Sequence, residues 1–257
     1  MSNVHPTAVV DPAAIVGEGC TIGPYCVIGP GATLGAGCEL HSHVVIDGNT
    51  ELGDANIIYP HACLGLRSQD LKWKGGATWT RVGSHNTIRE HVTIHSATGD
   101  GDATVIGSHN NFLAYTHVAH DCQLGDYIIM SNVATLAGHV QVGDRAIIGG
   151  LAAVHQFCRI GAMSIIGGCS KVVQDVPPFM MADGNPASTR AVNREGLNRN
   201  DVAEESQQAL RQAHRILFRE NLTFTKGVEK ARSEVALTDE VSHLLEFVES
   251  SERGIAR

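Results

Sequence analysis

Four histidines in the middle of this sequence are the side chains best suited to perform chemistry. They are His117, His120, His139 and His155. One neutral imidazole can act as a general base that removes a proton from a hydroxyl group attacking a carbonyl carbon. His120 with Asp121 would supply that base, and the backbone amides of residues 137–139 would stabilise the oxyanion. Three imidazoles could instead bind zinc, as in a carbonic anhydrase, and sequence spacing alone does not decide between these two chemistries.

The element that must position these histidines has a six-residue period. Apolar residues recur at every sixth position from Val4 to Val172, and only Asp70, Gly76 and Asp100 interrupt this apolar column. Six is not a helical period, but an even spacing keeps side chains on one face of extended chain. A fixed short period of this length indicates a solenoid whose successive coils pair as parallel strands.

Two further regularities accompany the apolar column. A glycine often follows the column residue, and we expect it to allow backbone conformations that a Cβ would forbid. The position two before the column is usually small, and five of the seven cysteines occupy it. We interpret these cysteines as small buried side chains, because no pair has the CxxC spacing of a zinc or redox site.

This hexad pattern resembles the hexapeptide-repeat acyltransferases. The resemblance implies a left-handed parallel β-helix with three hexads in each coil. Positions 120, 138 and 156 would then stack on successive coils, about 4.8 Å apart. His139 and His155 lie within one residue of two of these positions, so His120, His139 and His155 are expected within about 10 Å of each other.

Composition excludes several function classes. The 257-residue chain carries a net charge of −8 with 18% charged residues, which gives no electrostatic footprint for nucleic acid. The first ten residues lack the pattern of a signal peptide. The longest apolar stretch, residues 146–154, is too short to span a membrane. Free cysteines without a secretion signal indicate a cytoplasmic protein.

Breaks in the period define the domains. Two polar, glycine-rich excursions, residues 67–81 and 96–103, interrupt the column, and the six-residue register resumes in phase after each. The first excursion carries two lysines and two tryptophans. Loops on a rigid scaffold often carry binding groups. We predict an all-β domain over residues 1–185, a left-handed parallel β-helix, and a small α-helical C-terminal domain over residues 186–257 that caps the solenoid.

Helix signals support the second domain. Asp201 with Glu204 resembles a capping box before an apolar helical pattern. Thr238 precedes a second such pattern, which contains Val241, Leu244, Leu245 and Val248.

Eight segments together resemble the UDP-N-acetylglucosamine O-acyltransferase family, which begins lipid A biosynthesis. They are SQDLKW (68–73), IREHVTIH (88–95), THVAHDCQLG (116–125), NVATLAGHVQVGD (132–144), AVHQFCRIGAMSIIGGCS (153–170), QDVPPF (174–179), GNPA (184–187) and VNREGL (192–197). The resemblance implies a homotrimer with active sites between neighbouring β-helices. It also implies transfer of a 3-hydroxyacyl chain from the phosphopantetheine of acyl carrier protein to the 3-hydroxyl of UDP-N-acetylglucosamine, without a cofactor or metal of the enzyme's own.

The resemblance assigns roles residue by residue. His120 matches the catalytic base, and Gly138 matches the amide that holds the thioester oxyanion. Substrate-binding positions of the family match Asp70, Lys72, His117, His139, His155, Gln156, Asn193, Glu195 and Arg199. Gly168 matches the position whose side chain sets acyl-chain length, and glycine there predicts a chain of roughly C14 over a shorter one. The acidic carrier protein is expected to dock on Lys and Arg of the first loop and the tail.

Some alternatives stay open at this point. Asn198-Arg199-Asn200 replaces a more basic family segment, and Ser96-Ala97-Thr98 replaces Arg-Gly-Thr. Either change could favour a 3-amino sugar as acceptor. The related N-acyltransferase of the same pathway has an additional N-terminal domain, whereas here the period begins by Val4. A zinc carbonic anhydrase using His120, His139 and His155, and a catalytically silent scaffold, are the alternatives from other classes.

Overall fold

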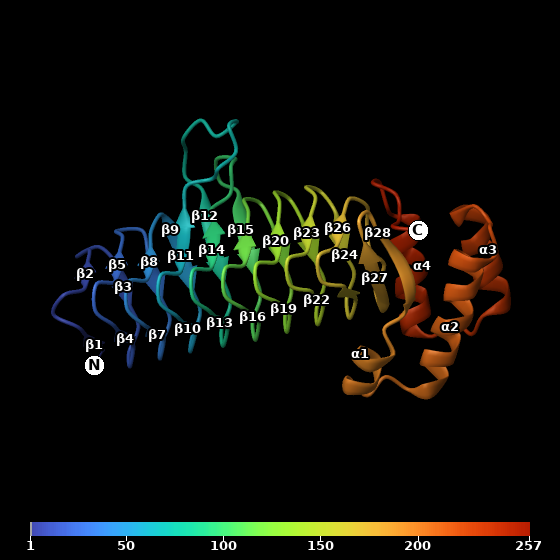
Figure 1. The fold of residues 1–257 in the computed structure, drawn as a ribbon. Coiled ribbons are helices and arrows are strands. Elements are labelled where there is room, and N and C mark those ends of the chain that lie inside the picture. Colours follow the sequence, from blue (N-terminus) through green and yellow to red (C-terminus); the bar gives the residue numbers. More distant parts are fainter. Residues whose placement is uncertain (1) are drawn as a thin grey trace.

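The computed structural model describes residues 2–257 as a long three-sided β-helix that ends in a helical domain (Figure 1). Three parallel sheets form its sides. The first sheet contains β1 (Asn3–Val4), β4 (Thr21–Ile22), β7 (Glu39–Leu40), β10 (Ile57–Ile58), β13 (Thr87–Ile88), β16 (Asn111–Phe112), β19 (Ile129–Met130), β22 (Ile147–Ile148), β25 (Ile165–Ile166), β27 (Met180–Gly184) and β28 (Ala187–Val192).

The other two sides are built in the same way. The second sheet contains β2 (Val9–Val10), β5 (Val27–Ile28), β8 (Val45–Ile46), β11 (Cys63–Leu66), β14 (Thr93–His95), β17 (His117–Val118), β20 (Thr135–Leu136), β23 (Ala153–Val154) and β26 (Lys171–Val172). The third sheet contains β3 (Ile15–Val16), β6 (Thr33–Leu34), β9 (Asn49–Leu52), β12 (Trp79–Val82), β15 (Ala103–Ile106), β18 (Gln123–Leu124), β21 (Gln141–Val142) and β24 (Arg159–Ile160).

Strand register locates the two excursions. Asn3 pairs with Thr21, so a regular coil has 18 residues. The spacing grows to 30 residues between β9 and β12 and to 24 residues between β14 and β17. The additional residues form a loop over residues 67–78 and a shorter one over residues 96–102, as the breaks in the apolar column predict. The longer loop projects from one edge of the β-helix (Figure 1).

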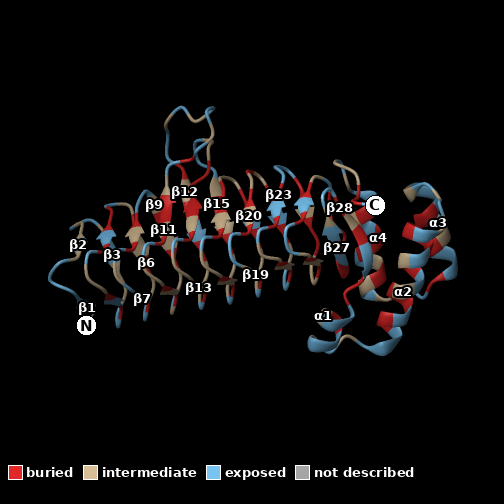
Figure 2. Ribbon diagram, viewed as in Figure 1, coloured by how far each residue is buried: buried red, intermediate tan, exposed pale blue. Residues whose placement is uncertain are grey.

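The apolar column forms the core of the β-helix. Its residues from Ile22 to Val172 are almost all buried, together with the five cysteines that precede column positions. Figure 2 shows these buried residues recurring along the coils. Burying one such aliphatic side chain stabilises the fold by about 1.5–3 kcal/mol. The prediction of small buried cysteines is confirmed.

Apart from Gly65 (φ 79°), the glycines that follow column residues do not adopt the positive φ that a Cβ would forbid. The left-handed turn residue lies three positions after the column residue and is mostly not glycine, as at Tyr25 (φ 60°) after Ile22. Glycine is instead required for close approach between coils. A Cβ on Gly35 would lie 2.5 Å from the carbonyl carbon of Gly53 in the next coil. Steric contact between coils, rather than a positive φ, explains this glycine.

Six of the fourteen histidines occupy these left-handed turns, where side chains of successive coils stack. One ladder contains His43, His61 and His91, whose ring centroids are 4.8 and 4.9 Å apart. A second contains His85 and His109, 5.0 Å apart and nearly parallel. These turns therefore account for six of the fourteen histidines without any catalytic role being needed.

The helical domain contains α1 (Arg194–Arg199), α2 (Glu204–Arg219), α3 (Phe224–Glu234) and α4 (Asp239–Glu249). The antiparallel hairpin β27–β28 leads into it, so the predicted boundary at residue 185 falls inside that hairpin. The N-cap of α2 is Ala203, which makes no side-chain cap, so the capping box at Asp201 was wrong. Thr238 caps α4 as expected, accepting a hydrogen bond from the Val241 amide.

Arg159 fastens the helical domain to the last coils. It forms a 3.0 Å ion pair with the buried Asp175 and donates a 2.9 Å hydrogen bond to the Phe247 carbonyl. Ser251, just after α4, donates to the same carboxylate. Within residues 2–257, no helix is long and apolar enough to cross a membrane.

Candidate active site

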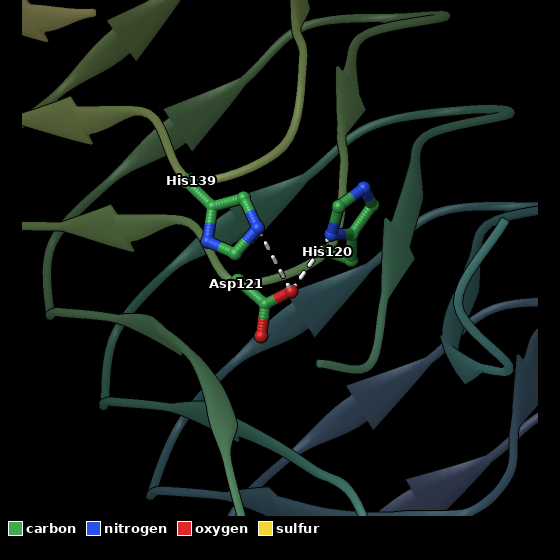
Figure 3. A group of neighbouring side chains, drawn as sticks. All are labelled: His120, Asp121 and His139. Carbon is green, nitrogen blue, oxygen red and sulfur yellow. Dashed lines mark hydrogen bonds and ion pairs between the residues drawn. The ribbon is translucent and has the colours of Figure 1, made fainter. Parts of the chain in front are cut away.

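His120 lies in a turn between the second and third sheets, at the edge from which the long loop projects. Its Nδ1 is 2.7 Å from Oδ2 of Asp121 (Figure 3). A carboxylate accepts hydrogen bonds, so Nδ1 carries the proton and donates it. The opposite nitrogen, Nε2, is then left as an acceptor, which is the form a general base requires.

Asp121 is held in place from several sides. Its carboxylate accepts hydrogen bonds from the Thr98 amide at 3.2 and 3.3 Å, and its own amide donates to Thr104 Oγ1. Its side chain is only 9% exposed, and its backbone adopts φ 62° in the turn. His139 Nε2 lies 3.6 Å from Oδ2 on the side away from His120 (Figure 3). Asp121 therefore fixes the orientation of His120, a role that the residue-by-residue match did not include.

Gly138 stacks directly on the His120 ring. A Cβ at this position would lie 2.5 Å from His120 Nε2 and 3.0 Å from Nδ1, so only glycine permits this approach. Within residues 2–257 its amide makes no hydrogen bond, whereas the Ala137 and His139 amides on either side both do. A free N–H beside the base is the arrangement that an oxyanion donor requires.

The half-buried His117 and the buried His95 form a pair beside the base. His117 Nδ1 is 2.7 Å from Thr93 Oγ1, and the two imidazoles meet edge to face at 5.2 Å. Burial, with His95 and His120 nearby, lowers the pKa of His117 to about 4. Burial also lowers the pKa of His95. Both rings are therefore neutral near pH 7. His95 received no role from the sequence, although it ends one of the matching segments.

A groove of about 610 Å³ brings six predicted site residues together. It is lined by His120, Gly138, His117, Gln156, Asp70 and Lys72, together with apolar and polar neighbours. Asp70 and Lys72 come from the long loop, where Asp70 Oδ1 accepts a 2.9 Å hydrogen bond from the Lys72 amide. The groove is large enough for a substrate and contains charged groups together with the base.

A second hollow of about 700 Å³ lies on the other side of Asp121. His139, Phe157 and Arg159 line it with the carboxylate. His155 lines neither hollow, and its Nδ1 lies 3.3 Å from Arg253 Nη2. The expected grouping of His155 with His120 and His139 within about 10 Å therefore stays a prediction. The group that the structure assembles contains Asp121 in place of His155.

Comparison with known proteins now decides the family. The chain is 48% identical to the acyl-[acyl-carrier-protein]–UDP-N-acetylglucosamine O-acyltransferase of Thermodesulfovibrio yellowstonii, with all of both chains covered. It is 49% identical to the enzyme of the same name from Rippkaea orientalis, covering all of this chain and 92% of the other. The chain belongs to this family.

Family profiles and solved structures agree. The profile of UDP-N-acetylglucosamine O-acyltransferase domain 2 matches residues 175–256, and that of the bacterial transferase hexapeptide matches residues 1–36 and 13–48. LpxA from Acinetobacter baumannii superposes with a TM-score of 0.95 at 44% identity, covering 99% of each chain. The Arabidopsis UDP-N-acetylglucosamine acyltransferase gives 0.89 at 38% identity, covering 99% of this chain and all of that one. The predicted left-handed β-helix and acyltransferase activity are confirmed.

Three residues matched to family positions lie outside the groove of a single chain. Asn193 is the N-cap of α1; it accepts from the Gly196 amide at 3.0 Å and donates to the Met163 carbonyl at 2.7 Å. Glu195 and Arg199 occupy the first and last turns of α1. None of the three lines the groove that contains His120.

Gly168 lies in the turn between β25 and β26. A Cβ there would meet only the Gly150 carbonyl oxygen, at 3.3 Å. The backbone of Gly168 does not adopt a positive φ. Backbone conformation therefore does not require glycine at this position, and the surface beside it is open.

Proposed function

We propose that this acyltransferase moves a 3-hydroxyacyl chain from acyl carrier protein to the 3-hydroxyl of UDP-N-acetylglucosamine, the first step of lipid A biosynthesis, in the cytoplasm. The names of its full-length relatives support the carrier protein and the sugar nucleotide as substrates. The observation that carries the mechanism is the contact between His120, whose Nδ1–H points to Asp121, and the free amide of Gly138.

His120 Nε2 takes the proton of the sugar 3-hydroxyl while its oxygen attacks the thioester carbonyl carbon. A C–O bond forms, and the Gly138 amide donates to the oxyanion of the tetrahedral intermediate. The intermediate then collapses, the C–S bond breaks, and the proton on His120 passes to the departing pantetheine thiolate. No other reactant is needed, so the step balances with the two substrates alone.

Surrounding charges support this cycle. The imidazolium formed at His120 is stabilised by the Asp121 carboxylate 2.7 Å away. His117 stays neutral because its pKa is about 4, so it adds no positive charge beside the imidazolium. Asp70, Lys72 and Gln156 line the groove and supply polar groups for the sugar nucleotide.

A homotrimer would complete the site. Asn193, Glu195 and Arg199 lie on or beside α1, outside the groove of their own chain. In a trimer with grooves between neighbouring β-helices, these residues of one chain can reach the substrates held by another. His139 and His155, which also lie outside the groove, would contribute from its edges.

A mass-spectrometric assay tests this function. The purified protein is incubated with UDP-N-acetylglucosamine and acyl carrier protein charged with 3-hydroxyacyl chains of different lengths. We expect an O-acylated sugar nucleotide, formed fastest with a chain of roughly C14 because Gly168 leaves its surface open. A UDP-linked 3-amino sugar serves as the competing acceptor. Faster acylation of the amine, or no transfer to either acceptor, would contradict the proposal.

A further inference from the structure

The side of the catalytic pair that faces the second hollow offers three metal-binding atoms. His120 Nδ1, Asp121 Oδ2 and His139 Nε2 all lie within 4.8 Å of one another. We propose that this trio binds a transition-metal ion such as Zn²⁺ and that the bound ion inhibits the transferase. The binding site stands on geometry alone, whereas the inhibition rests on the proposed role of His120 as the base.

The donor set and its spacing suit zinc. Zinc binds imidazole nitrogen and carboxylate oxygen tetrahedrally at about 2.0–2.2 Å, which places neighbouring ligand atoms about 3.3 Å apart. The distance from His139 Nε2 to Asp121 Oδ2 is already 3.6 Å. His120 Nδ1 and Asp121 Oδ2, at 2.7 Å, would need to separate by about 0.6 Å. The hollow leaves the fourth position open to water.

The ligands are held by a rigid frame. The Asp121 carboxylate accepts both hydrogen bonds from the Thr98 amide. The His139 ring stacks on Phe157 at 4.7 Å with an interplanar angle of 12°. Its side chain is 40% exposed, so an ion can reach the trio from the second hollow. Partners that orient ligands in this way typically increase metal affinity about 10- to 100-fold.

Metal binding at Nδ1 would disable the base. The ion takes the lone pair of Nδ1, so the single N–H proton of the neutral ring moves through solvent from Nδ1 to Nε2. In that state Nε2 cannot accept the proton of the attacking hydroxyl. Because the ion enters from the second hollow, it leaves the groove free for UDP-N-acetylglucosamine. Zinc should therefore lower kcat while leaving the KM for the sugar nucleotide little changed.

The histidine ladders are the competing metal-binding surface. Rings such as His85 and His109 stack nearly parallel at 5.0 Å, so their nitrogens lie side by side instead of converging on a point. Among residues 2–257, only His120, Asp121 and His139 bring three ligand atoms this close together. His109→Gln is therefore the matched control for His139→Gln.

Zn²⁺ titration calorimetry and visible absorption with Co²⁺ test the site on the full chain without substrates. We expect one strong site per chain, an affinity reduced at least about tenfold in His139→Gln, and wild-type affinity in His109→Gln. An unchanged affinity in His139→Gln, or an equal loss in His109→Gln, would overturn the site. Kinetics at saturating Zn²⁺ should show kcat at least about tenfold lower; full activity with the site occupied would overturn the inhibition. Failure of the proposed function would appear separately, as inactivity without metal.

Discussion

Ser68 Oγ and Thr98 Oγ1 lie 2.7 Å apart and join the two insertions of the β-helix. Ser68 also accepts a hydrogen bond from the Asp70 amide, and the Thr98 amide donates to Asp121. One hydroxyl pair thus connects the loop that carries Asp70 with the segment that holds the catalytic carboxylate.

Replacing Thr98 by valine removes this connection with little change in shape. A neutral hydrogen bond contributes about 0.5–1.5 kcal/mol, so we expect kcat/KM for UDP-N-acetylglucosamine to fall about 2- to 10-fold. Most of the change should be in KM, because the loop supplies the groove with Asp70 and Lys72. Steady-state kinetics of Thr98→Val and of Thr33→Val, a control on β6, measure this. Identical kinetics in the two variants would refute the coupling.

Gly138→Ala tests the contact between the base and the oxyanion donor. The added Cβ would collide with His120 near Nε2, displacing either the ring or the amide. Losing one oxyanion donor typically lowers kcat about 10²- to 10³-fold, and we expect a loss of this size. In Gly150→Ala, the control, the Cβ would meet the Asn132 carbonyl oxygen at 3.3 Å, which requires a shift of only a few tenths of an ångström. Near-normal activity in Gly138→Ala, with the protein folded by circular dichroism, would contradict the assignment.

Gly168→Met tests the acyl-chain groove. The wild-type surface at Gly168 is open apart from the Gly150 carbonyl oxygen, so a long side chain there fills space that the acyl chain would use. We expect the preferred donor to shift from roughly C14 to a chain shorter by several carbons, measured with the panel of acyl carriers. A C10 preference of the wild-type protein would already contradict this account.

Acidification should destabilise the fold through His117. Its pKa is about 4 in the folded protein and 6.5 in a model peptide, so between these values the unfolded chain binds more protons. The free energy of unfolding should therefore fall as the pH decreases from 6.5 towards 4. Urea unfolding across this range, at fixed protein concentration, should show a shallower dependence in His117→Gln than in wild type. Parallel curves would mean that His117 does not contribute.

The repeat made most of the fold predictable. A side chain that points inward at every sixth position specifies sheets, coils and core together, and breaks at Asp70, Gly76 and Asp100 locate the loops. The hairpin formed by β27 and β28 was not anticipated, because its strands follow no hexad and pair antiparallel. The start of α2 was also not anticipated, because its N-cap is Ala203, whose side chain can form no capping hydrogen bond that a sequence motif would indicate.

The site was predictable only in part. Coil spacing brings Gly138 onto His120, and the family motifs place Asp70 and Lys72 beside it. Coil spacing does not determine where a side chain points, and it gave no indication that His155 lies next to Arg253. The amide of Thr98 that holds Asp121 comes from an irregular loop, and no periodicity reports such a contact.

The most direct measurement compares acyl transfer by His120→Ala and by His109→Ala, using the favoured carrier and UDP-N-acetylglucosamine. We expect a loss of about 10²- to 10⁴-fold in kcat for His120→Ala, because a positioned general base contributes that much. His109 stacks in a turn ladder, so its variant should retain activity close to wild type. Retained transfer by a folded His120→Ala protein would contradict the general-base mechanism.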